Sequence, residues 1–241
     1  MSATPLPASH AVGTLPGLKE PQLLAGPGGV VWLLWLEQRP QEKGRTTALI
    51  RPFGASHQTP MELTPAPSSL RSRVHDYGGG VLTAAVNNDQ LLLVWIEAGC
   101  LWRQDWQLPE NAALQPQPLT TPVRLSLPGE GELADGQLDQ IHQRWIGIRE
   151  VDGLDQLVWL PLDARDQSPQ LLHQPADFAG YACLSPDGQH LAWVEWQQPS
   201  MPWDSSSLWC AEVGSDGALF NPRQLAGEEG VSVFQPQWLP D

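Results

Sequence analysis

Short apolar runs rich in Trp, Val, Leu and Ile recur along the chain and are separated by Pro, Gly or polar turn residues. Helical periodicity is hard to find in any of these runs. Short apolar runs bounded by turn residues are typical of β-strands, and many such strands in one chain indicate a sandwich, a barrel or a propeller. The pattern therefore predicts an all-β protein.

Four of the apolar runs end in a glutamate, which is followed by a loop and a second apolar run. These glutamates are Glu37, Glu97, Glu150 and Glu195. Their spacing of roughly 45 to 60 residues matches a propeller blade of four strands, and we do not expect a sandwich to repeat in this way. The repeat predicts an incomplete β-propeller of about four blades, truncated at its C-terminus. The second runs cover residues 47–50, 101–103, 157–160 and 208–211.

The turn before the fourth repeat has a sequence suited to its geometry. In Ser185-Pro186-Asp187-Gly188 the proline presets φ, the aspartate tolerates the third turn position, and the glycine accepts a left-handed exit. Residues 238–241 repeat the lead-in to this turn and stop before the glycine, so we expect a fragment of a longer protein. Residues 1–20 are expected to be a flexible leader and residues 21–241 a partial propeller.

The charge and cysteine content of the chain indicate which partners and which cellular compartment to expect. The net charge is −14, with only 13 Lys and Arg scattered along the chain, which argues against nucleic-acid binding. The three cysteines form no C-x-x-C pair, as expected for reduced thiols in a cytoplasmic protein. No signal peptide precedes the first repeat, and the longest apolar runs are too short to cross a membrane. The twelve Trp are expected to fill the layers between neighbouring blades.

Four segments carry a resemblance to a known family. Residues 73–80 (RVHDYGGG) resemble a segment near the start of the propeller in prolyl-oligopeptidase-family (S9) serine peptidases, with the acylaminoacyl-peptidase and dipeptidyl-aminopeptidase-like members as the nearest branch. An SPDG turn alone is a weak signal, but the four segments in order are fairly specific. The resemblance covers roughly residues 20–241. The later segments are SPDG with Leu191-Ala192-Trp193, MPWD with Leu208-Trp209, and VFQPQW at residues 233–238.

In that family the propeller caps an α/β-hydrolase domain, which carries a Ser-Asp-His triad, and restricts entry to small or unfolded peptides. The present chain has no G-x-S-x-G nucleophile elbow. The resemblance therefore implies a substrate-gating propeller of a serine peptidase that hydrolyses short peptides, of aminopeptidase or acylaminoacyl-peptidase type, with the catalytic domain missing from this chain. The alternative is a stand-alone propeller that binds a protein partner through its loops.

The four glutamates are the candidate substrate-binding residues. If the blades are equivalent, Glu37, Glu97, Glu150 and Glu195 lie at the same strand end and form an arc around the propeller mouth. Converging carboxylates raise the local negative potential and favour a cationic group, such as the α-amine of a peptide. The alternative is that each glutamate marks where its strand reaches water.

Other candidate sites have weaker patterns. His75-Asp76 suggests a catalytic pair, but neighbours in a strand point to opposite faces, so we expect a structural role. The three glycines that follow it indicate a close backbone approach. Residues 135–139 resemble part of a calcium loop without its remaining ligands, so we expect a turn. The six His lack ligand spacing, and we expect no metal and no cofactor. The loops at 38–45 and 196–207 are the longest of the four and are expected to bind ligands.

Overall fold

The computed structural model describes residues 15–239 and is all-β, with 50% of residues in strands and 4% in helices. The predicted fold class is confirmed. The helical content consists of three short 3-10 turns: η1 (Pro27–Gly29), η2 (Pro40–Glu42) and η3 (Val74–Asp76). Within residues 15–239, no helix is long and apolar enough to cross a membrane.

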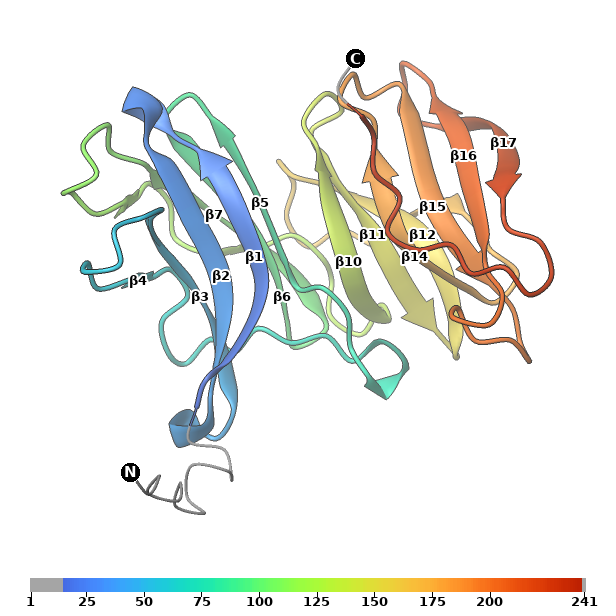
Figure 1. Cartoon of the computed structure of the whole chain (residues 1–241), viewed down its shortest axis with the longest axis horizontal. Coiled ribbons are helices and arrows are strands. Elements are labelled where there is room, and N and C mark those ends of the chain that lie inside the picture. The colour runs from blue at the N-terminus through green and yellow to red at the C-terminus, as the bar shows by residue number, and fades with distance from the viewer. Residues whose placement is uncertain (1–14, 240–241) are drawn as a thin grey trace, which may run out of the picture. The chain divides into compact units, whose positions relative to one another are not determined.

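The strands form four sheets that follow one another along the chain (Figure 1). Each sheet is a meander in which consecutive strands are neighbours, which is the arrangement of a propeller blade. The first sheet contains β1 (Gly17–Ala25), β2 (Val31–Arg39), β3 (Arg45–Pro52) and β4 (Met61–Glu62). The second contains β5 (Leu82–Asn87), β6 (Gln90–Glu97), β7 (Cys100–Gln107) and β8 (Gln117–Pro118), and β9 (Val123–Arg124) also pairs with β7. The third contains β10 (Glu132–Asp139), β11 (Arg144–Val151), β12 (Leu154–Pro161) and β13 (Gln170–His173). The fourth contains β14 (Phe178–Leu184), β15 (His190–Trp196), β16 (Ser207–Val213) and β17 (Leu219–Ala226).

The chain divides into two compact units. The first unit comprises Met1–Arg71, Ala84–Leu93 and Gln104–Thr121, and it contains the first sheet. The second unit comprises Ser72–Thr83, Val94–Arg103 and Pro122–Asp241, and it contains the third and fourth sheets. The second sheet contributes residues to both units.

The predicted repeat of glutamate, loop and second strand is present in every sheet. The four glutamates lie in the second strands β2, β6, β11 and β15, at or near their C-terminal ends. The predicted partner runs lie in the third strands β3, β7, β12 and β16. The short apolar runs therefore predicted the central hairpin of each blade correctly.

Each second strand buries one tryptophan. Trp32, Trp95, Trp145 and Trp193 are each at most 1% exposed and are the largest fully buried side chains described. In the second unit, Trp193 belongs to a buried cluster that joins the third sheet to the fourth through Ile146, Leu157 and Leu191. Burying a side chain of this size contributes on the order of 2–3 kcal/mol or more. The expectation that tryptophans fill the layers between blades is confirmed for Trp193, and the other three are buried.

The SPDG turn has the geometry that its sequence predicts. Ser185 Oγ donates to Asp187 Oδ1 at 2.6 Å, and the backbone N–H of Gln189 donates to the same oxygen at 3.0 Å. Gly188 has a φ of +69° and its N–H donates to the Ser185 carbonyl at 2.8 Å. The turn therefore connects β14 to β15, which pair antiparallel with Leu184 opposite Leu191.

Two predictions concern the chain ends. The expected leader, residues 1–20, lies largely outside the described residues, but β1 begins at Gly17 and so includes its last four residues. Pro240 and Asp241, which complete the repeated lead-in motif, also lie outside the described residues.

A β-bulge recurs in the first strand of three sheets. The pairing register shifts between Lys19 and Gln22 in β1, between Ala134 and Gln137 in β10, and between Gly180 and Cys183 in β14. Each bulge contains a non-glycine residue with positive φ, namely Glu20, Asp135 and Tyr181. A bulge bends its strand and increases the local twist, so β1, β10 and β14 share this irregularity.

Candidate substrate-binding site

Two side-chain donors contact the carboxylate of Glu195. Its Oε1 accepts hydrogen bonds from His173 Nε2 at 2.7 Å and from Trp193 Nε1 at 2.6 Å. The Glu195 side chain is only 13% exposed. The two hydrogen bonds hold Oε1 between His173 and Trp193 and so restrict the orientation of the carboxylate.

The strand geometry explains why these groups meet. Trp193 and Glu195 are two residues apart in β15 and therefore point to the same face of the sheet. Trp209 lies opposite Trp193 in β16, and the two rings stack with centroids 6.4 Å apart. The ring of His173, from β13 of the third sheet, lies 5.0 Å from the Trp193 ring.

A cavity of about 360 Å³ lies beside this carboxylate. Its walls include Glu195, Trp196 and Trp209, and the remaining lining consists mainly of Ser and Gln side chains from the 197–207 segment. This segment is the long connection between β15 and β16. Ser206 anchors it, since its Oγ donates to the Pro202 carbonyl at 3.1 Å and accepts from the Val233 N–H at 2.9 Å.

The second sheet repeats part of this arrangement. Trp95 Nε1 donates to Glu97 Oε2 at 3.3 Å, and the Trp95 ring stacks on Trp102 with centroids 6.5 Å apart. A W-x-E run on the second strand and a tryptophan on the third thus give the same local contacts in two blades. This combination is visible in the sequence, but its geometry becomes evident only when the hairpins are paired.

Glu150 has a different role. Its Oε2 accepts from the backbone N–H of His75 at 3.1 Å, and its Oε1 accepts from the backbone N–H of Gly153 at 3.0 Å. Both carboxylate oxygens are therefore occupied by backbone donors. One donor belongs to the β11–β12 turn and the other to η3, so Glu150 joins these two segments.

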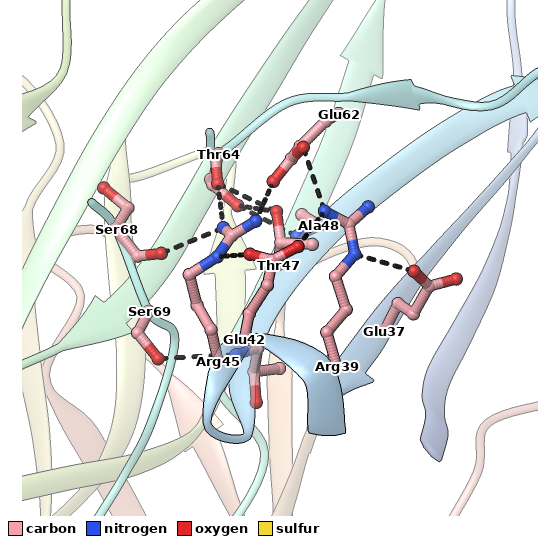
Figure 2. Close-up of polar contacts among 11 residues, drawn as sticks. Glu37, Arg39, Glu42, Arg45, Thr47, Ala48, Glu62, Thr64, Ser68 and Ser69 are labelled. Atoms are coloured by element: carbon pink, nitrogen blue, oxygen red, sulfur yellow. Dashed lines mark hydrogen bonds and ion pairs between the residues drawn. The ribbon is translucent and has the colours of Figure 1, made fainter. Parts of the chain in front are cut away.

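Glu37 belongs to a network of ion pairs in the first sheet (Figure 2). Arg39 contacts Glu37 at 2.8 Å, Glu42 at 3.1 Å and Glu62 at 3.2 Å. Arg45 contacts Glu42 and Glu62, both at 2.5 Å. Burial raises the pKa of Glu62, but the hydrogen bond from Arg45 and the neighbouring positive charges outweigh it, so the net shift is downward. The negative charge of Glu37 is thus compensated within its own blade.

The four glutamates therefore have different surroundings. Glu37 lies in the first unit, whereas Glu97, Glu150 and Glu195 lie in the second. The common arc stays a prediction. Glu195 and Glu37 each line a cavity, of about 360 and 470 Å³, and the Glu195 side chain is the less exposed of the two, at 13% against 22%.

His75 and Asp76 do not lie in a strand, as the prediction assumed, and the structural role stays a prediction. Both residues lie in η3 rather than in a strand, with φ values of 49° and 62°. His75 Nε2 lies 2.8 Å from Asp155 Oδ1, not against Asp76, and the Asp155 side chain is 2% exposed. Burial raises the pKa of Asp155, although hydrogen bonds from Ala179 and His75 oppose the shift. No local signal could have found a partner 80 residues away.

The glycines of RVHDYGGG have the expected role. A Cβ on Gly79 would lie 2.7 Å from the Ala134 Cβ, and the Gly80 N–H donates to Asp135 Oδ1 at 2.6 Å. The expected turn at residues 135–139 is wrong, because these residues belong to β10 and Asp135 forms its bulge. Burial raises the pKa of Asp135, against the hydrogen bond from Gly80. The motif thus packs its backbone directly onto the bulge of the third sheet.

Within residues 15–239, no group of three or more His, Cys, Asp or Glu side chains could hold a metal ion. Cys100 and Cys210 are buried and Cys183 is half-buried, and all three are free thiols. Burial raises the pKa of each thiol. Unreactive thiols of this kind act as small apolar side chains.

Comparisons with known proteins identify similar structures but no sequence family. The protein-family models give no match, and the curated proteins give none either. The solved structure of a puromycin-hydrolysing peptidase from Mycobacterium tuberculosis matches 95% of this chain and 35% of that chain, with 28% identity and a TM-score of 0.72. The crystal structure of puromycin hydrolase matches 87% of this chain and 33% of that chain, with 26% identity and a TM-score of 0.67. TolB from Acinetobacter baumannii, at 13% identity and a TM-score of 0.52, supports the fold alone.

The present chain spans about a third of the length of the two peptidases that it matches. The match covers nearly all of its own residues, so the similarity extends over all four sheets.

Proposed function

We propose that this chain, a β-propeller that resembles those of the prolyl-oligopeptidase (S9) family, admits short peptides to the catalytic domain of a serine peptidase. The observation that carries the proposal is the structural match to a puromycin-hydrolysing peptidase over 95% of the chain. The resemblance of the RVHDYGGG segment to a family segment supports the same proposal.

In this proposal the propeller restricts entry and orients the substrate, while the triad lies in a domain beyond these residues. The absence of a G-x-S-x-G run from the 241 residues is consistent with this division of labour. Peptide hydrolysis would then proceed by acyl transfer to a serine, and the contribution of this chain would be binding and positioning.

The candidate substrate-binding residues remain Glu37, Glu97, Glu150 and Glu195. Glu195 has the strongest support, because the cavity that it lines is formed mainly by Ser and Gln, whereas the cavity that Glu37 lines is formed mainly by Pro, Leu and Trp. Glu150 and Glu37 are engaged by backbone donors and by Arg39, so we assign them electrostatic contributions at most.

The gating role is tested with the product of the full reading frame. We expect cleavage of di- to tetrapeptide amides and no cleavage of the same sequence within a folded protein or a long polypeptide. Equal rates on short and long substrates would contradict gating by the propeller.

The alternative is a stand-alone propeller that binds a protein partner. The product of the full reading frame also distinguishes this alternative from the peptidase. A reading frame that closes without a G-x-S-x-G run, together with no hydrolysis of any short peptide, would favour the scaffold over the peptidase.

A further inference from the structure

One face of the first sheet combines open apolar side chains with a guanidinium. Leu33, Trp35 and Glu37 alternate along β2 and therefore point to the same face of the sheet. The pairing register places Leu18 of β1 opposite Glu37. It also places Arg51 of β3 opposite Leu33, and residues opposite each other share a face. Leu18 is 68% exposed, and Leu33 and Trp35 are half-buried, so this face presents apolar surface to a binding partner.

A cavity of about 470 Å³ lies on this face. Its apolar walls are formed by Leu18, Leu33 and Trp35 and by two prolines, Pro16 and Pro21. All of its lining residues belong to the first unit. The volume is within the range of small-molecule sites, and the walls favour an apolar ligand because contact with it removes apolar surface from water.

Arg51 forms no ion pair in the described part of the chain. Its Cζ lies 5.7 Å from the centre of the Trp35 ring, so the guanidinium lies on the cavity side of the sheet. Arg51 is half-buried, and its Nε is buried without a hydrogen-bond partner among residues 15–239. A buried donor without an acceptor and a partly desolvated charge without a counterion are both unfavourable. An anionic group bound beside the guanidinium would offset part of this cost.

The rest of the cavity lining does not oppose an anion. Glu37 is the only acidic residue among the described lining residues, and Arg39 pairs with it at 2.8 Å (Figure 2). Lys19 also lines the cavity and adds a second positive charge. The attraction between a cation and an anion is stronger beside apolar walls than in open water. The cavity therefore suits an apolar ligand with a negative charge, although the chain as a whole carries a net charge of −14.

We propose that this cavity binds a small apolar carboxylate, with the Arg51 guanidinium as the partner of the carboxylate. A guanidinium donates two parallel hydrogen bonds to a carboxylate, which gives this pair both strength and direction. Leu33 and Trp35 contact the apolar body of the ligand. A free aliphatic or aromatic acid and the C-terminus of an apolar peptide share this chemistry. The proposal is independent of the peptidase assignment, because it rests on the first sheet alone.

The proposal is tested by calorimetric titration of the 241-residue chain, at a concentration at which ultracentrifugation shows the monomer. The probes are 3-phenylpropanoate, its neutral amide 3-phenylpropanamide, and acetate, which lacks the apolar body. We expect 3-phenylpropanoate to bind, the amide to bind at least about tenfold more weakly, and acetate not to bind at the same concentrations.

A fourth probe, N-acetyl-leucyl-phenylalanine, distinguishes the two sources of the carboxylate. Binding tighter than that of 3-phenylpropanoate would assign the site to a peptide C-terminus, and weaker binding would assign it to a free acid. Either order supports the site, provided that the corresponding amides bind more weakly.

Three variants assign the binding to the guanidinium. Arg51→Gln removes the charge, and we expect the affinity for 3-phenylpropanoate to fall by about tenfold or more. Arg51→Lys keeps the charge without the planar fork and should retain part of the affinity. Arg71→Gln is the matched control, since Arg71 is an exposed arginine of the same unit outside the cavity lining. We expect the control to bind as the wild type does.

A measurement on the wild type covers the case in which Arg51→Gln fails to fold. The NMR signal of the Arg51 Nε–H should shift when 3-phenylpropanoate is added and stay unchanged with the amide. Equal binding of the acid and the amide would overturn the proposal, as would unchanged affinity in Arg51→Gln or an unshifted Arg51 signal at saturating acid. Self-association that Arg51→Gln abolishes, without binding of any acid, would assign this face to a second copy of the chain and would also overturn the proposal.

Discussion

The buried ion pair at the β10–β11 turn leads to a quantitative prediction about stability. Asp139 has a side-chain exposure of 0%, and its Oδ2 accepts from Arg144 Nε at 2.9 Å and from His142 Nδ1 at 2.7 Å. Its Oδ1 accepts from the backbone N–H groups of Ile141 and His142 at 3.1 and 3.0 Å. The Arg144 side chain is 3% exposed and lies over the Trp159 ring at 5.7 Å.

The substitution Asp139→Asn removes one charge and leaves the Arg144 guanidinium buried without a counterion. Breaking a buried pair in this way costs about 3–5 kcal/mol. The two side-chain bonds lead to a similar value, at about 1.5–3 kcal/mol for each hydrogen bond to a charged group. We therefore expect the free energy of unfolding to fall by about 3–5 kcal/mol.

The assay is urea-induced unfolding followed by tryptophan fluorescence, with Asp166→Asn as the matched control. Asp166 also pairs with an arginine, Arg124, at 2.7 Å, but these side chains are 48% and 37% exposed. Water replaces such a contact, so we expect the control to unfold as the wild type does. Equal destabilisation by the two substitutions would refute the reasoning, because the Asp139 carboxylate is buried and has several donors, whereas the Asp166 carboxylate is exposed and has one side-chain donor.

The same carboxyl group predicts a pH dependence. Burial raises the pKa of Asp139, but the hydrogen bonds from His142 and Arg144 outweigh it, so the net shift is downward. A group with a lowered pKa in the folded state stabilises the protein above its unfolded pKa, and this contribution is lost as pH falls through the folded value. The difference between wild type and Asp139→Asn should therefore be full at neutral pH and shrink below about pH 4.

Three further predictions concern packing, electrostatics and association. Gly79→Ala should lower the melting temperature, because the new Cβ would lie 2.7 Å from the Ala134 Cβ. Gly180→Ala is the control and should be tolerated, since its nearest contact would be at 3.6 Å. Equal melting temperatures of the two variants would contradict the close approach at Gly79. Charge reversal at Glu150 and Glu195 in the full-length protein should raise KM for free-amine peptides and leave KM for acylated peptides unchanged; equal effects would remove the electrostatic role. The isolated chain should self-associate in analytical ultracentrifugation, because β1 and β17 expose large apolar side chains such as Phe220, which is 48% exposed. A monodisperse monomer would show that these strands do not mediate self-association.

The sequence predicted the central hairpins of the blades because their signals are local. A W-x-E run, a loop and a second apolar run predict β2–β3, β6–β7 and β15–β16 from local sequence. The SPDG turn is equally local, since Ser185, Asp187 and Gly188 satisfy one another's hydrogen bonds. The fold class followed from these repeated units.

The first strands and the contacts of the site were not predictable in the same way. In β10 and β14 the bulges at Asp135 and Tyr181 shift the alternation of apolar residues, so the pattern of period two is lost. The His75–Asp155 and His173–Glu195 contacts join residues 80 and 22 positions apart. Such pairs depend on the packing of one segment against another, which the spacing of residues does not encode.

The central claim is that this propeller serves a peptidase that acts on short peptides. The most direct test is hydrolysis of an unblocked tripeptide amide by the product of the full reading frame. We predict that the peptide is cleaved and that changing the serine of a downstream G-x-S-x-G run to alanine abolishes cleavage. A full-length product that contains no such serine and leaves every short peptide intact would contradict the claim.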